Sequence, residues 1–138
     1  MTISNVHLDL DHNTPVSIRA RVSYTVTFTP LERHLAALGM RFQEQISILG
    51  FDGGEGFGVP PVEVLANFAN LPLPVSDGET ELALERIRWR NIEHGDLHAE
   101  DPGAPDEVTA RVTVRPIGFF WTPGSSDSSG VEIVPVYP

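Results

Sequence analysis

The sequence predicts an all-β domain, an antiparallel two-sheet sandwich of immunoglobulin-like type with about seven strands and one short helix after the second strand. Three observations lead to this prediction. Apolar and polar residues alternate with a period of two along several segments, as in strands with one buried and one wet face. Wet faces indicate antiparallel sheets. The 138 residues suffice for one core and are too few for two ordinary domains. A closed antiparallel barrel is the alternative architecture.

The clearest strand is predicted over residues 17–29. One phase of this segment is entirely apolar, with Ile18, Ala20, Val22, Tyr24, Val26 and Phe28. The opposite phase carries only serine, threonine and arginine. A first strand has Val6, Leu8 and Leu10 in phase, and the Asp, Asn and Pro residues of 11–15 are typical of a turn. We therefore expect the first two strands to form a hairpin-like pair.

A short helix is expected directly after the second strand. Thr29 can cap it, Pro30 suits the first helical position, and Glu32 completes a capping box with Thr29. The helix has one expected apolar stripe, made of Leu31, Leu35 and Leu38. Gly39 is expected to end it.

The remaining strands are expected at residues 41–49, 62–68, 108–115 and 131–137, with a loop at 71–78. Residues 79–92 fit a strand or a helix. The strand is preferred, with a β-bulge near Glu85 and Arg86 that would bring Leu82, Leu84, Ile87 and Trp89 to one face.

The chain is read as a single domain spanning residues 1–138. Its segment 118–138 is expected to be a linker followed by a C-terminal strand or tail. Residues 118–130 are expected to be irregular, because 125–130 have the serine- and glycine-rich composition of a flexible linker.

The charge balance excludes several function classes. The nine basic residues are all arginines, against 19 acidic residues, which gives a formal net charge of −10. With neither lysine nor cysteine, Schiff-base catalysis, thiol chemistry and disulfides are impossible. The negative charge opposes binding to nucleic acid and to anionic membranes, so neither partner is expected. No signal-like or membrane-spanning segment is present in the sequence, and a cytoplasmic location is expected.

One histidine-rich segment suggests a metal site. His94, Asp96 and His98 alternate, so an extended chain would point them to one side, and a helix would also place the two histidines on one face. Two imidazoles and a carboxylate suit zinc or another first-row divalent metal. The alternative is a solvated polar loop, which Pro102, directly after this segment, favours. No other cofactor is expected.

The arginines suggest a second chemistry. Arg86, Arg88 and Arg90 alternate, and other strands carry further arginines in one phase: Arg19, Arg21, Arg111 and Arg115. If these strands were neighbours, a basic face could capture carboxylate or phosphate. The alternative is cross-strand pairing of the arginines with acidic residues, for which the candidates are Glu44, Glu81, Glu85 and Glu107.

An aromatic cluster is the candidate partner-binding site. Phe119, Phe120 and Trp121 follow a terminated strand, and adjacent strand residues cannot all face one core. At least one ring should therefore pack against a loop, the tail or another chain. The alternative is that the C-terminal tail of the same chain covers these rings.

These observations favour a non-enzymatic interaction or structural module that self-associates or docks into a larger assembly. No catalytic residue is assigned. The first alternative is a small metal-binding protein or metal-dependent enzyme that uses the His94, Asp96 and His98 cluster. The second is a carbohydrate- or anion-binding sandwich that uses Trp89 or Trp121 together with the arginines.

Overall fold

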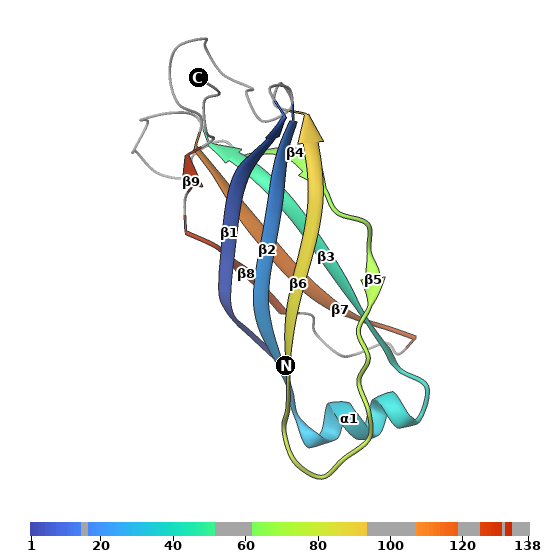
Figure 1. Cartoon of the computed structure of the whole chain (residues 1–138). Helices are drawn as coiled ribbons and strands as arrows, with labels where there is room; N and C mark the ends of the chain where they lie inside the picture. The colour runs from blue at the N-terminus through green and yellow to red at the C-terminus, as the bar shows by residue number, and fades with distance from the viewer. Residues whose placement is uncertain (15–16, 52–61, 94–106, 119–124, 131, 134–138) are drawn as a thin grey trace.

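The computed structural model describes residues 1–14, 17–51, 62–93, 107–118, 125–130 and 132–133 (Figure 1). Its elements are β1 (Thr2–Thr14), β2 (Ser17–Phe28), α1 (Pro30–Ala37), β3 (Arg41–Phe51), β4 (Val62–Asn67), β5 (Leu71–Pro72), β6 (Leu82–Glu93), β7 (Glu107–Ile117), β8 (Ser125–Ser128) and β9 (Glu132–Ile133). All strand pairs in these two sheets are antiparallel. The all-β prediction is therefore confirmed.

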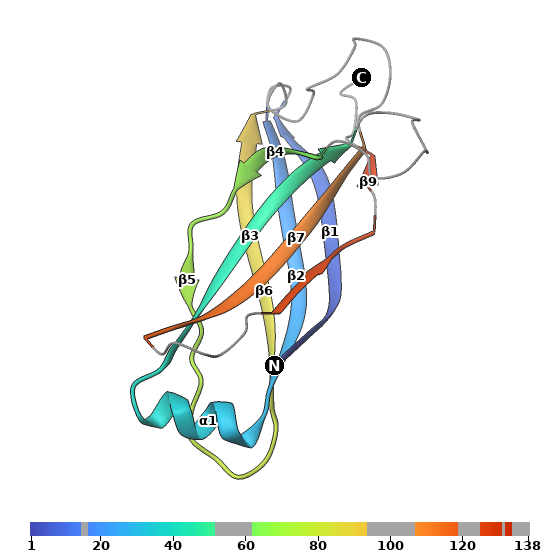
Figure 2. The same cartoon turned by 180° about the vertical axis from the view of Figure 1, so that it is seen from behind.

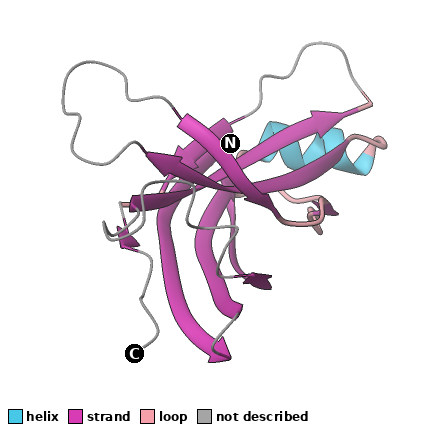
Figure 3. Ribbon diagram, turned by 90° about the horizontal axis from the view of Figure 1, so that it is seen from above, coloured by secondary structure: helices cyan, strands magenta, loops and turns pink. Residues whose placement is uncertain are grey.

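The strands form two sheets that lie face to face. The first sheet has the order β1-β2-β6, and the second has the order β4-β3-β7-β8, with β5 also paired to β3 and β9 to β7. Figures 1 and 2 show the first sheet crossing over the second, and Figure 3 shows the two layers from above. Within the described strands, no strand of one sheet pairs with a strand of the other. The sandwich prediction is thus confirmed, and the closed-barrel alternative is wrong.

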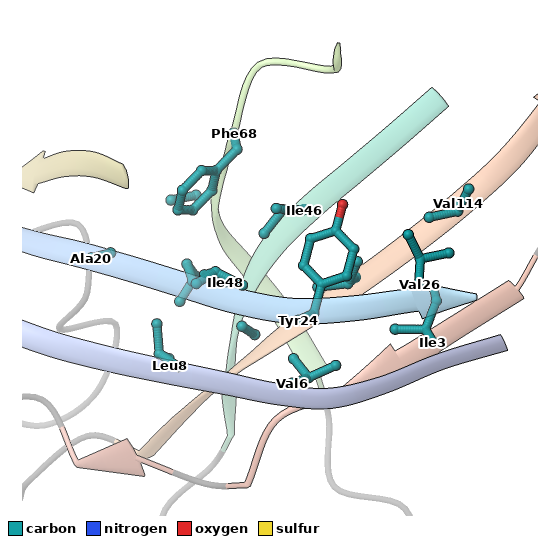
Figure 4. Close-up of a cluster of buried hydrophobic side chains, with 14 of the residues drawn as sticks. Ile3, Val6, Leu8, Ala20, Tyr24, Val26, Ile46, Ile48, Phe68 and Val114 are labelled. Atoms are coloured by element: carbon teal, nitrogen blue, oxygen red, sulfur yellow. The ribbon is translucent and has the colours of Figure 1, made fainter. Parts of the chain in front are cut away.

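The core lies between the inner faces of the two sheets (Figure 4). The predicted apolar phase of β2 is buried along its whole length, from Ile18 to Phe28. It packs against the inner side of the second sheet, where Val112 and Ile46 are buried. The rings of Phe28 and Phe42 lie with their centroids 4.9 Å apart in a tilted arrangement, which aromatic pairs favour.

Helix α1 begins as predicted. Thr29 caps it with a full capping box, in which the Glu32 amide donates to the Thr29 hydroxyl and the Glu32 carboxylate accepts from the Thr29 amide. The Glu32 carboxylate also pairs with the α-amino group of Met1 at 2.8 Å. Gly39, at φ 109°, follows the cap residue Leu38 in a conformation that favours glycine.

The predicted stripe of leucines on α1 is wrong in two of its three members. Leu31 is 66% exposed and Leu38 is 75% exposed, whereas Leu35 is partly buried against the core. The reason is the position of the helix. It lies at one end of the sandwich and does not cover a face of either sheet, so most of its surface is exposed (Figure 1). Within the described residues, no helix is long and apolar enough to cross a membrane.

Residues 82–93 form a strand, as preferred, but the predicted bulge near Glu85 and Arg86 is wrong. The register between β2 and β6 is unbroken, from Ser17 opposite Glu93 to Phe28 opposite Leu82. The alternating pattern continues without a shift, so Leu82, Leu84 and the arginines Arg86 and Arg88 share the inner side. The irregularity lies instead in β1 between Ser4 and His7, where Asn5 has φ 54°.

The predicted linker is wrong over Ser125–Ser128, which forms strand β8 beside β7. Serine hydroxyls satisfy the neighbouring strand: the Ser129 hydroxyl accepts from the Ala110 amide at 2.8 Å, and Ser126 and Thr113 share a hydrogen bond of 3.0 Å. Two further short pairings modify the predictions. Strand β5 lies in the segment 71–78 expected as a loop, and β9 is the described part of the strand expected at 131–137.

Removal of the helix cap should destabilise the fold. Thr29→Ala deletes the hydroxyl that accepts from Glu32, and we expect a loss of about 1 kcal/mol in the free energy of unfolding. Chemical denaturation measures this loss. Thr29→Ser keeps the hydroxyl and should retain most of the stability, and an equal loss in both variants would contradict the capping role.

Candidate functional site

Both sites predicted from local sequence patterns lie outside the described residues. This applies to the metal candidates His94, Asp96 and His98, and to the aromatic cluster Phe119, Phe120 and Trp121. In the part of the chain that the structure describes, no group of three or more His, Cys, Asp or Glu side chains could hold a metal ion. The chemistry that can be located therefore lies on the faces of the sheets and between them.

The arginines do not form the single basic face that would have followed if their strands were all neighbours. The β2–β6 register places Arg21 opposite Trp89 and Arg19 opposite Asn91, on the outer side of the first sheet. Arg86 lies opposite the buried Tyr24, on the inner side of the same sheet. Arg86, Arg88 and Arg90 have the opposite strand parity from Trp89. Arg86 and Arg88 point inward and so cannot join Arg19 and Arg21 on one face, whereas Arg90 is exposed on the edge strand. Arg111 and Arg115 belong to the second sheet.

A buried carboxylate organises the inner arginines. Glu44 of β3 is 0% exposed and points into the core between the sheets. It accepts a hydrogen bond from the Tyr24 hydroxyl and forms an ion pair with Arg88. Arg88 also donates to the backbone carbonyl of Ala69 at 3.1 Å. The Nε atom of Arg86 lies 3.9 Å from the same carboxylate. Among the expected acid partners, Glu44 is confirmed, and its pair joins the two sheets rather than two neighbouring strands.

This cluster has a structural role that its energetics make clear. Removing a carboxylate and a guanidinium from water costs several kcal/mol per ion, which close pairing offsets when the remaining hydrogen bonds are made. The Nε of Arg86 is buried without a hydrogen-bond partner, so the cluster is incompletely satisfied. Strand β6 is an edge of its sheet, and inward-pointing charges on an edge strand oppose pairing with other chains. The net contribution of the cluster to the free energy of unfolding is therefore small. Its main effect is to hold β6 in one position against the second sheet.

Burial also controls the ionisation of the tyrosine in this cluster. Desolvation raises the pKa of Tyr24 to about 12, against the opposing effect of Arg86 and Arg88. A neutral phenol can donate its proton to Glu44, which a phenolate could not do. The hydrogen bond in the core is thus maintained until strongly alkaline pH.

We call the outer side of β1, β2 and β6 the tryptophan face; it is turned to the viewer in Figure 1. Trp89 is 47% exposed on it and Ile87 is 51% exposed, two residues apart on β6. The Arg19 guanidinium lies 3.9 Å from the centre of the Trp89 ring, a cation–π contact. Arg21 lies 5.5 Å from the same ring and pairs with Asp9 at 3.1 Å.

A shallow hollow of about 310 Å³ opens beside Trp89. Its lining consists of Arg19, Trp89, Arg90 and Asn91. Two guanidinium groups, an indole and an amide are side chains that can contact an anion or a sugar ring. Trp89 and two of the arginines named for the predicted carbohydrate- or anion-binding site, Arg19 and Arg90, thus line one hollow.

We call the outer side of β3, β7 and β8 the arginine face, which Figure 2 shows from its own side. Its exposed charges are Arg41, Arg111 and Arg115. Polar residues fill the positions between them, and Ser47 donates to the Asn67 side chain at 2.7 Å. A hollow of about 380 Å³ lies where this face meets the segment after β4, lined by Gln45, Ile46, Ser47, Asn67, Phe68 and Asn70.

The loop before β6 is held by α1. Arg33 donates to the backbone carbonyls of Ser76, Asp77 and Thr80 at 2.8 to 2.9 Å. A Cβ at Gly78 would collide with this guanidinium, so the close approach requires glycine. A hydrogen bond from His34 holds the pKa of Asp77 below its usual value. Arg33 therefore has a structural role in this loop and does not contribute charge to either sheet face.

One signal for the inner cluster was present in the sequence. Glu44 shares a strand phase with Phe42, Ile46 and Ile48, all of which are buried. Arg86 and Arg88 likewise share a phase with Leu82 and Leu84. Charged residues of opposite sign in the apolar phases of two strands indicate a buried pair, provided that the register is known.

Replacement of Glu44 should be strongly destabilising. Glu44→Leu leaves Arg88 partly buried without its partner, and we expect a loss of about 3 to 5 kcal/mol in the free energy of unfolding. The double variant Glu44→Leu, Arg88→Leu should recover part of that loss, because only the more distant Arg86 is then left without the carboxylate. Chemical denaturation of the wild type, the two single variants and the double variant measures the coupling energy between Glu44 and Arg88. Glu85→Leu, at an exposed position, is the control. Simple additivity of the two single losses would contradict the pairing.

The raised pKa of Tyr24 predicts an alkaline loss of stability. The folded state retains the phenol proton above the ordinary pKa of 10, so its stabilising effect is complete below pH 10 and is lost as the pH rises through about 12. The loss should be roughly 2 to 3 kcal/mol. The chain has no lysine or cysteine and two tyrosines, so few other side chains titrate in this range. Denaturation at several pH values should show a flatter profile for Tyr24→Phe, and equal slopes would refute the assignment.

Comparison with known proteins adds no family to this description. No protein-family model matches the chain, and no curated protein matches it in sequence. The function is therefore argued from the geometry of the two faces and the core.

Proposed function

We propose that the chain is a non-enzymatic interaction module that associates with further copies of itself and so builds a larger assembly. The observation that carries this proposal is the half-exposed pair Trp89 and Ile87 on β6 of the tryptophan face, with Arg19 stacked on the indole. Tryptophan and arginine are the residue types enriched at the energetic centres of protein interfaces. The indole is pre-positioned by Arg19, so docking would order few side chains.

The strand order supports an immunoglobulin-like assignment for this module. The orders β1-β2-β6 and β3-β7-β8 correspond to the A-B-E and C-F-G orders of immunoglobulin-type sandwiches. In such a sandwich the outer faces are free of covering helices, and α1 lies at one end here (Figure 1). Among the described residues, no helix covers either broad face, which favours contact with partners on both.

The ionisable groups of the interior support a structural rather than a chemical role. Glu44, Tyr24 and Arg88 bond to one another between the sheets, and Glu44 has no exposed surface on which a substrate could act. The aromatic cluster Phe119, Phe120 and Trp121 remains a predicted additional partner surface. Metal binding at His94, Asp96 and His98 and a cytoplasmic location also stay predictions.

A second candidate function is the binding of an anionic sugar. The hollow lined by Arg19, Trp89, Arg90 and Asn91 favours it, because the guanidinium groups suit a carboxylate and the indole suits a sugar ring. A panel of neutral and acidic glycans, read by tryptophan fluorescence, tests it. Binding of acidic glycans that Arg90→Gln weakens would support this candidate, and absence of binding up to millimolar concentration would eliminate it.

The proposed self-association should depend on Trp89. Trp89→Thr keeps a residue suited to a strand and removes the indole, so we expect the apparent dissociation constant to rise at least about tenfold. Light scattering and sedimentation velocity over a range of concentrations measure it. Leu38→Ser removes an exposed apolar side chain on α1 and should leave association unchanged. A strictly monomeric wild-type chain would contradict the proposal.

A further inference from the structure

The two broad faces of the sandwich differ in the sign of their net charge. On the arginine face, the outer positions run from Arg41 to Ser47 on β3 and from Arg111 to Ile117 on β7. They include Arg41, Arg111 and Arg115. Glu107, at the start of β7 in the same strand phase, is the one carboxylate on the outer side of β3 and β7 among the described residues, so arginines outnumber it three to one. Asp127 of β8 lies opposite Val112, on the other side of the sheet. In a chain of net charge −10, this surface is locally positive.

The three arginines of this face are available for contact with a partner. All three side chains are exposed, and among the described residues none of them forms an ion pair. Arg115 lies opposite Gln43, and Arg111 lies opposite Ser47 and Ser128. Their neighbours are therefore uncharged hydrogen-bonding groups that do not neutralise them.

On the tryptophan face, acidic side chains outnumber basic ones. Its outer positions carry four exposed acidic side chains, Asp9, Asp11, Glu85 and Glu93. Only Asp9 has a cationic partner within the described part of the chain, which is Arg21. Arg19 lies opposite Asp11 in the register, yet its guanidinium is stacked on Trp89. The face thus presents an exposed indole and three carboxylates that have no ion-pair partner among the described residues.

We infer that the tryptophan face of one copy docks on the arginine face of the next copy. This inference rests on the proposed self-association and specifies its surfaces and its symmetry. Acidic groups of one copy meet free guanidinium groups of the other, and the indole of Trp89 contacts the amide and hydroxyl side chains between them. Opposite signs attract across this pairing, whereas either face stacked on its own counterpart would place like charges together.

The pairing of two different faces has a geometric consequence. An interface between unlike surfaces is heterologous, so each docked copy leaves one face of each kind free for the next copy. The two faces lie on opposite sides of the sandwich (Figure 3), so addition can continue in one direction. The expected product is an open stack of copies that grows with concentration.

The size of the faces predicts a weak interface. Three strands about 4.8 Å apart and 12 residues long span roughly 600 Å², so a stacked pair would bury about 1,200 Å² in total. That area is at the low end for specific interfaces. Because the attraction is electrostatic, an increase in NaCl from about 50 mM to about 500 mM should weaken association about tenfold.

A mixing experiment with two charge-reversed variants tests the inference. Arg111→Glu with Arg115→Glu disables the arginine face, and Asp11→Arg with Glu85→Arg disables the tryptophan face. Each variant alone should be monomeric in sedimentation velocity at concentrations where the wild type associates. Their mixture should associate, because the tryptophan face kept by the first variant meets the arginine face kept by the second, and the two reversed faces are again opposite in sign.

Controls separate this result from general effects of charge. Glu79→Arg with Glu81→Arg changes the net charge as much as the second variant does, lies in the loop before β6, and should associate like the wild type. Circular dichroism and thermal unfolding establish that each variant is folded.

The outcomes separate this inference from the function on which it rests. If the wild type associates but the mixed variants remain monomeric, the pairing of unlike faces is wrong while self-association stands. The same conclusion follows if either variant alone still associates. If the wild type is monomeric at every concentration, both proposals are wrong.

Discussion

The arrangement of the two sheets depends on one buried carboxylate. Glu44 projects from β3 into an otherwise apolar interior, where it requires partners from the opposite sheet. Tyr24 of β2 and Arg88 of β6 supply them, so the register of one sheet is set relative to the other. With an apolar residue at this position, one sheet could shift by two residues along the other and still bury it. With Glu44, such a shift would break the ion pair with Arg88. The inward arginines also keep the β6 edge from pairing with further strands.

The sequence predicted the parts of the fold that follow from local periodicity. The apolar phase of β2, from Ile18 to Phe28, and the capping box of Thr29 and Glu32 depend on nearby residues alone. Strand β8 was missed because its sequence is almost entirely serine, and its conformation comes from hydrogen bonds with β7. The exposure of Leu31 and Leu38 depends on where α1 lies relative to the sheets, which a helical stripe does not reveal.

The composition of the two faces could be predicted only in part. The sequence shows which residues alternate along a strand, but it does not show which strands are neighbours. The alternation of Arg86, Arg88 and Arg90 was clear, but their separation from Arg19 and Arg21 follows from the β2–β6 register. The same register places Trp89 opposite Arg21, and the guanidinium of Arg19 lies over its ring. Of the inner arginines, Arg88 pairs closely with Glu44 and Arg86 lies beside the same carboxylate, so the outer charges define the two faces. The net charge of −10 thus conceals an arginine face that is locally positive.

The central claim is that two unlike faces of the sandwich meet when copies associate. Two-dimensional amide NMR spectra recorded at increasing protein concentration test it most directly. The claim predicts that amides around Trp89 on β6 and around Arg111 on β7 broaden together, with one common concentration midpoint. Amides of α1, which lies on neither face, should remain sharp. Broadening confined to a single face would contradict the claim.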